Sequence, residues 1–144
     1  MTALLKDRNT PTSLGDKRNG AVAAGVKIYA GAMLVRNAAG YILPATTTLN
    51  QVGVGRAEAQ VDNTAGADGA VNVDFLPGNF RYANSAAGDL ITIADIGSIA
   101  WAVDDQTVAK TNGTNTRSRA GVIDNVDPQG VWVRFDEALT AAAV

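Results

Sequence analysis

Side chains that could support catalysis are few in this 144-residue chain. It has no cysteine and no histidine, which excludes thiolate nucleophiles, Cys/His zinc sites and proton transfer by histidine. Ser98 or Ser118 with Lys110 could form a nucleophile and a base, but no spacing signature brings such a pair together. We therefore expect a protein that is not an enzyme and that has no catalytic residues.

Aspartates are the next candidates, because carboxylate oxygens bind calcium and magnesium. Four of them lie in two groups near predicted strand ends: Asp104, Asp105, Asp124 and Asp127. Their spacing is not that of a metal-binding loop, and aspartate at a strand end usually shapes a turn. Residues 62–69 (DNTAGADG) lack the glutamate and alternating ligands of a calcium loop, and residues 53–58 (GVGRAE) lack the third glycine of a phosphate loop. The sequence predicts no metal and no cofactor.

Charge and hydropathy argue against two further classes of partner. The net charge is -2, and the arginines at 56, 81, 117 and 119 form no basic stripe, so we expect no nucleic-acid binding. No apolar run is long enough to span a membrane, and residues 1–20 do not read as a signal peptide. The expectation is a soluble protein without a membrane partner.

The first twenty residues are predicted to be an N-terminal arm. Residues 1–20 carry Lys6, Arg8, Lys17 and Arg18 among small polar residues, with apolar residues too sparse for any period. Such a segment is either a disordered chain end or a segment that orders against a partner. In the second case, its four positive charges indicate an acidic partner surface.

Residues 21–135 are predicted to form the folded domain, an all-β barrel or sandwich. Short alternating segments are separated by Gly, Asn and Asp turns, which indicates about ten short strands. We expect strands over 26–29 and 33–36, a kink at Gly31, a turn over 37–40, and a short return strand that ends at Pro44. Residues 136–144 form a short tail, the only helical candidate, with Asp136 as its cap.

Two further strand arrangements are predicted in residues 91–122. Ile91 and Ile93 are expected on one strand face, and Ile99, Trp101 and Val103 on another. Residues 107–122 are a hairpin candidate, because Asn112-Gly113 favours a tight turn.

A pattern that occurs twice identifies core strands and two interface candidates. The segments 52–75 and 118–135 both contain Gly-Val, then Val-Asp, a turn with glycine, and Val-x-Val-x-Phe. The alternation places Val71, Val73 and Phe75, and likewise Val131, Val133 and Phe135, in the core. It turns Trp132 and Arg134 outward, and these two residue types are frequent anchors at interfaces. We interpret the two copies as similar hairpin corners of one barrel.

These segments resemble a known family. The resemblance covers about residues 18–135 and lies in AAGVKIYAGAMLV, AAGYILPA, VGVGRAEAQVDNTAGADGAVNVDF, GNFRYAN and DDQTVAKTNGTNTRSRAGVIDNVDPQGVWV. The chain resembles small tailed-bacteriophage head proteins, the capsid decoration, cement or minor capsid proteins.

The resemblance implies a structural role in the virion. It implies an all-β module, made in the host cytoplasm, that sits on the outer surface of the phage head and stabilises the capsid by bridging major capsid protein subunits. It also implies a homo-oligomer on the capsid, a trimer or a dimer. Lys6, Arg8, Lys17 and Arg18 would then be arm residues in contact with the capsid.

Two other functions remain open at this point. A carbohydrate-binding module would need Trp101, Trp132, Tyr82 and Asp104 to converge on one cleft. A tail or baseplate component would have the same composition as a decoration protein, and only its location on the virion would distinguish the two.

Overall fold

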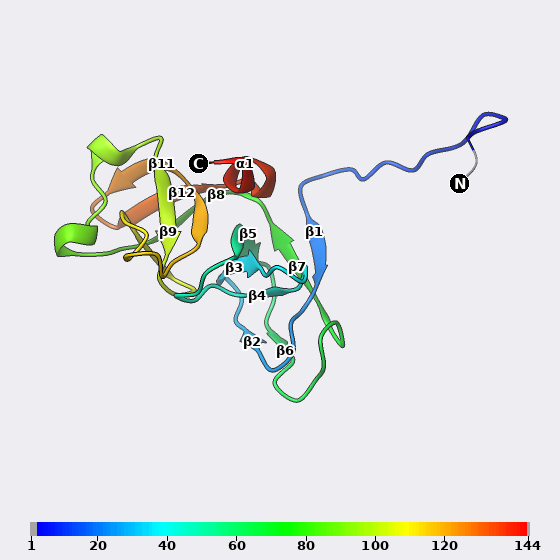
Figure 1. The fold of residues 1–144 in the computed structure, drawn as a ribbon, viewed down its shortest axis with the longest axis horizontal. Coiled ribbons are helices and arrows are strands. Elements are labelled where there is room, and N and C mark those ends of the chain that lie inside the picture. The colour runs from blue at the N-terminus through cyan, green and yellow to red at the C-terminus, as the bar shows by residue number, and fades with distance from the viewer. Residues whose placement is uncertain (1–2, 144) are drawn as a thin grey trace.

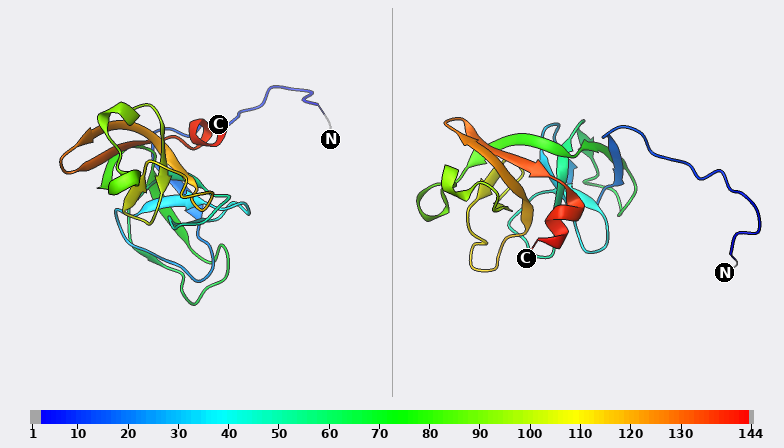
Figure 2. Two further views of the ribbon diagram at one scale, coloured as in Figure 1. Left: turned by 60° about the vertical axis from the view of Figure 1, so that its left-hand side comes forward. Right: turned by 90° about the horizontal axis from the view of Figure 1, so that it is seen from above.

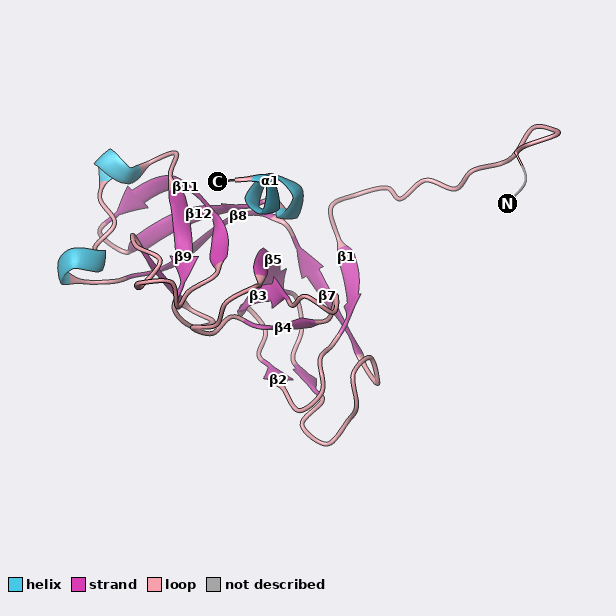
Figure 3. Ribbon diagram, in the orientation of Figure 1, coloured by secondary structure: helices cyan, strands magenta, loops and turns pink. Residues whose placement is uncertain are grey.

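The computed structural model describes residues 3–143, and nearly all regular structure in it is β. The described residues form short strands, one short α-helix and two single 3-10 turns, whose arrangement can be followed in Figures 1 and 3. The strands are β1 (Arg18–Ala21), β2 (Lys27–Ile28), β3 (Met33–Arg36), β4 (Ile42–Pro44), β5 (Val52–Ala57), β6 (Val61–Asp62), β7 (Asn72–Leu76), β8 (Gly78–Asn84), β9 (Ile99–Ala102), β10 (Thr107–Ala109), β11 (Arg119–Asp127) and β12 (Gly130–Phe135). The helix is α1 (Glu137–Ala142), and the 3-10 turns are η1 (Ala87–Asp89) and η2 (Ile93–Asp95). The all-β prediction is confirmed.

Five strands close into a ring. β11 pairs with β12, β12 with β8, β8 with β10, β10 with β9, and β9 again with β11. A second group of strands runs in the order β1-β7-β5-β3-β4 and joins the ring where β5 meets β11 at the pair Val52 and Arg119. β2 and β6 form a separate two-stranded ribbon. Closure removes sheet edges from the ring but leaves β1 and β4 as edge strands of the second group.

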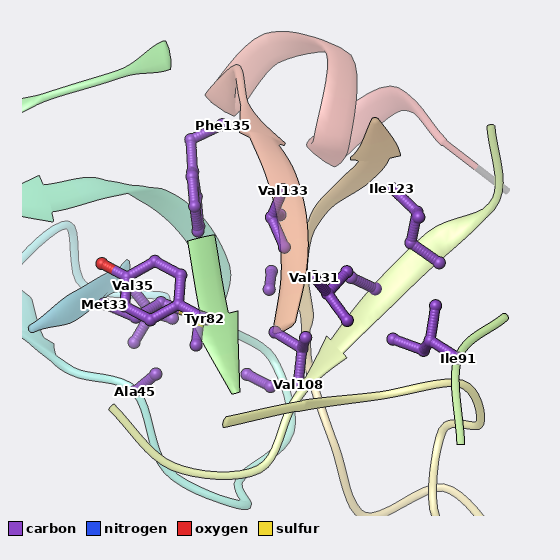
Figure 4. Packing of buried hydrophobic residues seen from close by; sticks show 13 residues of the cluster. Met33, Val35, Ala45, Tyr82, Ile91, Val108, Ile123, Val131, Val133 and Phe135 are labelled. Atoms are coloured by element: carbon purple, nitrogen blue, oxygen red, sulfur yellow. The ribbon is translucent and has the colours of Figure 1, made fainter. Parts of the chain in front are cut away.

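Two hydrophobic cores follow from this arrangement. The first lies among the ring strands and includes Val131, Val133 and Phe135 (Figure 4). The second lies against the other strand group and includes Val73 and Phe75. The prediction that both copies of the repeated pattern supply core residues is confirmed, although each copy serves a different core.

β3 joins these cores because both of its faces are buried. Met33 and Val35 belong to the first core, whereas Leu34, between them, belongs to the second. A strand of alternating residues therefore separates two apolar layers, which explains its continuous apolar sequence.

An aromatic contact fills one end of the first core. The Phe135 and Tyr82 rings lie edge to face with centroids 5.8 Å apart. The Tyr82 hydroxyl donates to the carbonyl oxygen of Gly31 over 2.9 Å, so its polar atom is satisfied. Burial raises the pKa of Tyr82 far above its ordinary value. Tyr82 is therefore a structural residue and is not accessible to a ligand.

Several local predictions are confirmed in detail. β3 spans residues 33–36 as expected, the Gly40 amide donates to the Asn37 carbonyl in the following turn, and β4 ends at Pro44. The Asp136 side chain accepts a hydrogen bond from the Leu139 amide, so it caps α1 as predicted. The predicted strand over 26–29 is shorter, since β2 covers only two residues.

Of the two strand faces predicted between residues 91 and 103, the first is wrong and the second is confirmed for Ile99 and Trp101. Ile93 lies in the 3-10 turn η2 and is 74 % exposed, whereas Ile91 is buried, so the two do not share a strand face. In β9, the buried positions are Ala100 and Ala102, and Ile99 and Trp101 lie on the outer side. Ile99 and Trp101 therefore share one face as predicted, and Val103 lies beyond the end of β9. Ala100 and Ala102 pack in the first core with Ile123 and Val108.

The predicted hairpin over residues 107–122 is also wrong. β10 pairs with β9 and β8, and β11 pairs with β12, β9 and β5, so β10 and β11 are not partners. The segment between them is a wide loop in which Gly113, Thr114 and Asn115 all have positive φ. The Asn112-Gly113 pair, which favours a tight turn, therefore lies in a loop between two strands that do not pair with each other.

The arm is shorter than predicted, and the tail is not loose. β1 begins at Arg18 and pairs with β7, so residues 18–20 belong to the folded domain. Residues 3–17 have no regular structure and run away from the folded domain in every view (Figures 1 and 2). At the other end, α1 packs against β5 and β11.

Candidate functional site

The arm is the most exposed part of the chain. Every residue from 3 to 17 is exposed, including Lys6 and Arg8, which form no ion pair within residues 3–143. Three leucines of the arm are also exposed, Leu4 at 71 %, Leu5 at 91 % and Leu14 at 86 %. Sequence reasoning attended to the cations and missed these leucines, because they follow no helical or strand period. Apolar side chains on an exposed arm are typical of a segment that becomes ordered on a partner.

Lys17 and Arg18 lie apart from Lys6 and Arg8, at the base of the arm. The Lys17 ammonium lies 3.0 Å from the Asp74 carboxylate on β7. The Arg18 guanidinium donates to the carbonyl oxygens of Gly15 and Lys17. These two residues fix the point where the arm leaves the sheet, whereas the outer cations are available to a partner.

A polar network joins β1 to β7 at this base. The Asn19 amide donates to the Asp74 carboxylate over 2.9 Å, and the Asn72 amide donates to the Asn19 side-chain oxygen over 2.6 Å. The hydrogen bond from Asn19, and then the one from Lys17, holds the pKa of Asp74 below its ordinary value. The network was not predicted, since it depends on the pairing of strands that are far apart in sequence.

Beside the arm base lies a groove with a volume of about 380 Å³. Arg36 and Glu137 of α1 form a bidentate ion pair in its wall, and Phe75 and Pro77 supply apolar surface. Arg18 lines the same groove, so the arm leaves the folded domain next to a partly apolar cavity. A partner that binds the arm would also reach this groove.

Charge divides the chain into two parts. The arm with Arg18 carries four cations against the two carboxylates of Asp7 and Asp16, whereas the rest of the chain carries eight cations and twelve carboxylates. The arm is thus positive and the folded domain negative. An acidic partner surface would attract the arm and repel the domain, which favours contact through the arm first.

Trp132 and Arg134 lie on the outer face of β12, as predicted. Trp132 is half-buried and faces Arg81 on β8, whose guanidinium is 5.6 Å from the centre of the indole. Arg134 is exposed opposite Asn79. The two form, with Arg81, an outer face distant in sequence from the arm.

Asp127 explains why Trp132 is not fully exposed. Its carboxylate accepts a 2.8 Å hydrogen bond from the Trp132 indole nitrogen and also accepts from the amides of Gln129 and Gly130. The hydrogen bond from Trp132 contributes most to lowering the pKa of Asp127 below its ordinary value. This aspartate is therefore a turn and positioning residue and not a metal ligand.

Replacing Trp132 with alanine is expected to lower the free energy of unfolding by about 1–2 kcal/mol, because it removes half-buried apolar area and one hydrogen bond to a carboxylate. Urea unfolding followed by circular dichroism measures this change. Arg134→Ala, an exposed position on the same strand, is the control and should change the free energy by less than about 0.5 kcal/mol. A loss above about 3 kcal/mol for Trp132→Ala would instead place this residue in the core.

Folding stability is expected to be constant between about pH 5 and pH 8 and to fall below about pH 4. Hydrogen bonds lower the folded-state pKa of Asp74, Asp89 and Asp127, so each stabilises the fold above its unfolded pKa of about 3.9 and loses that contribution as the pH falls. Asp105 acts in the opposite sense, because burial and the neighbouring Asp104 raise its pKa. Melting temperatures across this range check the prediction, and a transition near pH 6.5 would contradict it, since the chain has no histidine.

The residues proposed for a carbohydrate cleft do not converge. Tyr82 is buried in the first core, and Trp132 is hydrogen-bonded to Asp127 on the outer face of β12. Trp101, on β9, lies opposite Arg119 on β11. Within residues 3–143, no group of three or more His, Cys, Asp or Glu side chains is placed to hold a metal ion. None of the helices in that range is long and apolar enough to cross a bilayer.

No protein-family model matches this chain, and no curated protein or solved structure is significantly similar to it. Its function is therefore inferred from its residues and their geometry, together with the resemblance described above.

Proposed function

We propose that this protein is a structural component of a tailed-phage virion, bound to the outer surface of the head, where it stabilises the capsid by bridging major capsid protein subunits. The observation that carries the proposal is the exposed arm of residues 3–17. It extends from a closed β domain and presents unpaired cations and exposed leucines. These features suit attachment to a surface and supply no catalytic group.

The two parts of the chain have separate tasks in this proposal. The ring and the second strand group, each with its own core, provide a unit whose packing does not involve the arm. The arm lies along a neighbouring capsid subunit, with Lys6 and Arg8 on acidic side chains and with the leucines in apolar depressions. The edge strand β1 continues the arm into the sheet, so force on the arm is carried by the β1–β7 hydrogen bonds.

Bridging follows if the domain touches one subunit while the arm touches another. Two linked contacts convert the second binding step into an intramolecular one and raise the apparent affinity by orders of magnitude. The outer face with Trp132 and Arg134 is the second contact in this proposal, either with capsid protein or with another copy in a dimer or trimer.

The test is attachment to heads. Purified protein is mixed with expanded empty heads of the cognate phage, sedimented, and quantified against free protein, and shell survival on heating is measured in parallel. Saturable binding that raises the temperature of shell disruption is the expected result. Absence of binding to heads, with the protein found on tails, would overturn the head assignment in favour of a tail or baseplate component.

A further inference from the structure

A hollow of about 430 Å³ lies on the surface beside β9 and β11. It is formed where the chain enters β5, where β9 and β11 run side by side, and where the loop between β10 and β11 folds back. Its lining includes Gln51, Trp101, Asn112, Asn115, Arg117 and Arg119. Its size falls in the range of sites for small ligands.

Trp101 and Arg119 form the floor of the hollow. They are paired positions on β9 and β11, and the guanidinium lies 5.8 Å from the centre of the indole ring. Trp101 is only half-buried, so Arg119 and the neighbouring strands do not cover the whole indole. The geometry leaves indole surface for a second planar or ring-shaped group.

The charge of the hollow is positive although the chain is acidic overall. Its lining contains two arginines and no aspartate or glutamate. Arg117 is neutralised from behind by Asp89, at 3.1 Å, whereas Arg119 has no carboxylate partner within residues 3–143. A planar guanidinium without a partner is suited to bidentate binding of a carboxylate.

Hydrogen-bonding atoms of the lining are also left without partners. The Gln51 side-chain oxygen and the Arg117 Nε are buried and have no hydrogen-bond partner in the described chain. Buried polar atoms are normally satisfied, so these two mark one unmet acceptor and one unmet donor in the wall of the hollow. Asn50 and Asn115, both with positive φ, line the same hollow. Such backbone conformations are frequent where a loop is shaped for binding.

The hollow is braced before any ligand arrives. The Asp89 carboxylate accepts from both Arg117 and Thr111, which holds the loop at residues 111–117. The Ser118 hydroxyl accepts from the Gln51 amide and donates to the Thr48 carbonyl, which fixes the other wall. Binding would therefore cost little ordering of the protein.

We propose that this hollow binds a sugar acid, a hydroxyl-rich ring that carries a carboxylate. The apolar face of the ring lies on Trp101, the carboxylate is held by Arg119, and the hydroxyls bond to Gln51 and the asparagine amides. Trp132 serves as the control tryptophan. Its indole nitrogen already donates to Asp127, and it does not line the hollow that contains Trp101. This site would add recognition of an acidic polysaccharide to the structural role, and it does not depend on attachment to heads.

The experiment follows the two indole N–H signals in ¹H–¹⁵N spectra of the intact protein, assigned with Trp132→Phe. The probes are D-glucuronate, D-glucose and acetate, each titrated separately. We expect glucuronate to shift the Trp101 signal and not the Trp132 signal, with a Kd of about 1 mM, as for a small ligand with few contacts. Glucose should bind at least about tenfold more weakly, because it lacks the carboxylate.

Two variants complete the test. Arg119→Gln should weaken glucuronate binding by about tenfold or more, and Arg134→Gln, an exposed arginine elsewhere, should leave it unchanged. If acetate shifts the Trp101 signal as much as glucuronate does, the hollow is a simple anion site. If glucose binds as tightly as glucuronate, the carboxylate is not recognised. Either result, or no saturable shift of Trp101, would overturn the proposal. Head attachment is measured separately, so its failure would not be confused with failure here.

Discussion

Replacing Gly53 with alanine is expected to destabilise the fold by about 4 kcal/mol or more, among the largest effects of a single substitution in this chain. A Cβ atom at Gly53 would lie 1.8 Å from the Ala120 carbonyl oxygen and 2.8 Å from the Ala120 Cα. These are backbone atoms of β11, which cannot rotate away as a side chain would. The substitution therefore forces β5 and β11 apart where the two strand groups join.

The measurement is urea unfolding of Gly53→Ala followed by circular dichroism. Domains of this size are stable by about 5–15 kcal/mol, so a loss of this magnitude would leave the variant partly unfolded at 25 °C. Gly88→Ala is the matched control, because a Cβ there meets nothing within 4 Å and Gly88 does not have a positive φ. The control should change stability by less than about 0.5 kcal/mol, and a similarly small change for Gly53→Ala would refute the argument.

Much of the local structure could be predicted from the sequence, because local chemistry determines it. The turn after β3, the end of β4 at Pro44, and the cap of α1 by Asp136 each depend on neighbours within a few residues. Alternation also identified Val131, Val133 and Phe135 as core, since one face of β12 is buried along its whole length.

Topology could not be predicted, because it depends on packing between distant segments. Asn112-Gly113 satisfied a turn rule, yet β10 pairs with β8 and β9. Alternation in β9 was read correctly as a period of two, but it did not show that the small side chains of Ala100 and Ala102 would be the buried ones. The end of the arm was misplaced for the same reason: Arg18 pairs with Phe75, which is far away in the sequence.

The candidate site was predicted in part. Lys6, Arg8, Trp132 and Arg134 lie at exposed or half-buried outer positions, as expected from composition and alternation. The partners of Trp132 and the hollow at Trp101 required coordinates, because each joins residues from strands or loops distant in sequence.

Deleting residues 2–16 is expected to reduce the apparent affinity for expanded heads by about 100-fold or more while leaving the melting temperature of the free protein unchanged. Residues 3–17 are exposed throughout, and the loss within the domain is limited to one surface hydrogen bond, from Arg18 to the Gly15 carbonyl. The deletion stops before Lys17 so that the ion pair with Asp74 and the whole of β1 are kept. Occupancy by co-sedimentation and thermal unfolding measure the two effects.

Two variants separate the contributions of charge and apolar surface within the arm. Lys6→Ala with Arg8→Ala should weaken attachment and reduce its dependence on salt, since the partner surface is expected to be acidic. Leu4→Ser with Leu5→Ser should weaken attachment without changing that dependence. Lys110→Ala, which removes a cation from the domain, is the control. Full occupancy after deletion of the arm would contradict the proposed attachment and would leave the outer face of β12 as the surface to test, because Trp132 and Arg134 would then be the remaining candidate contacts.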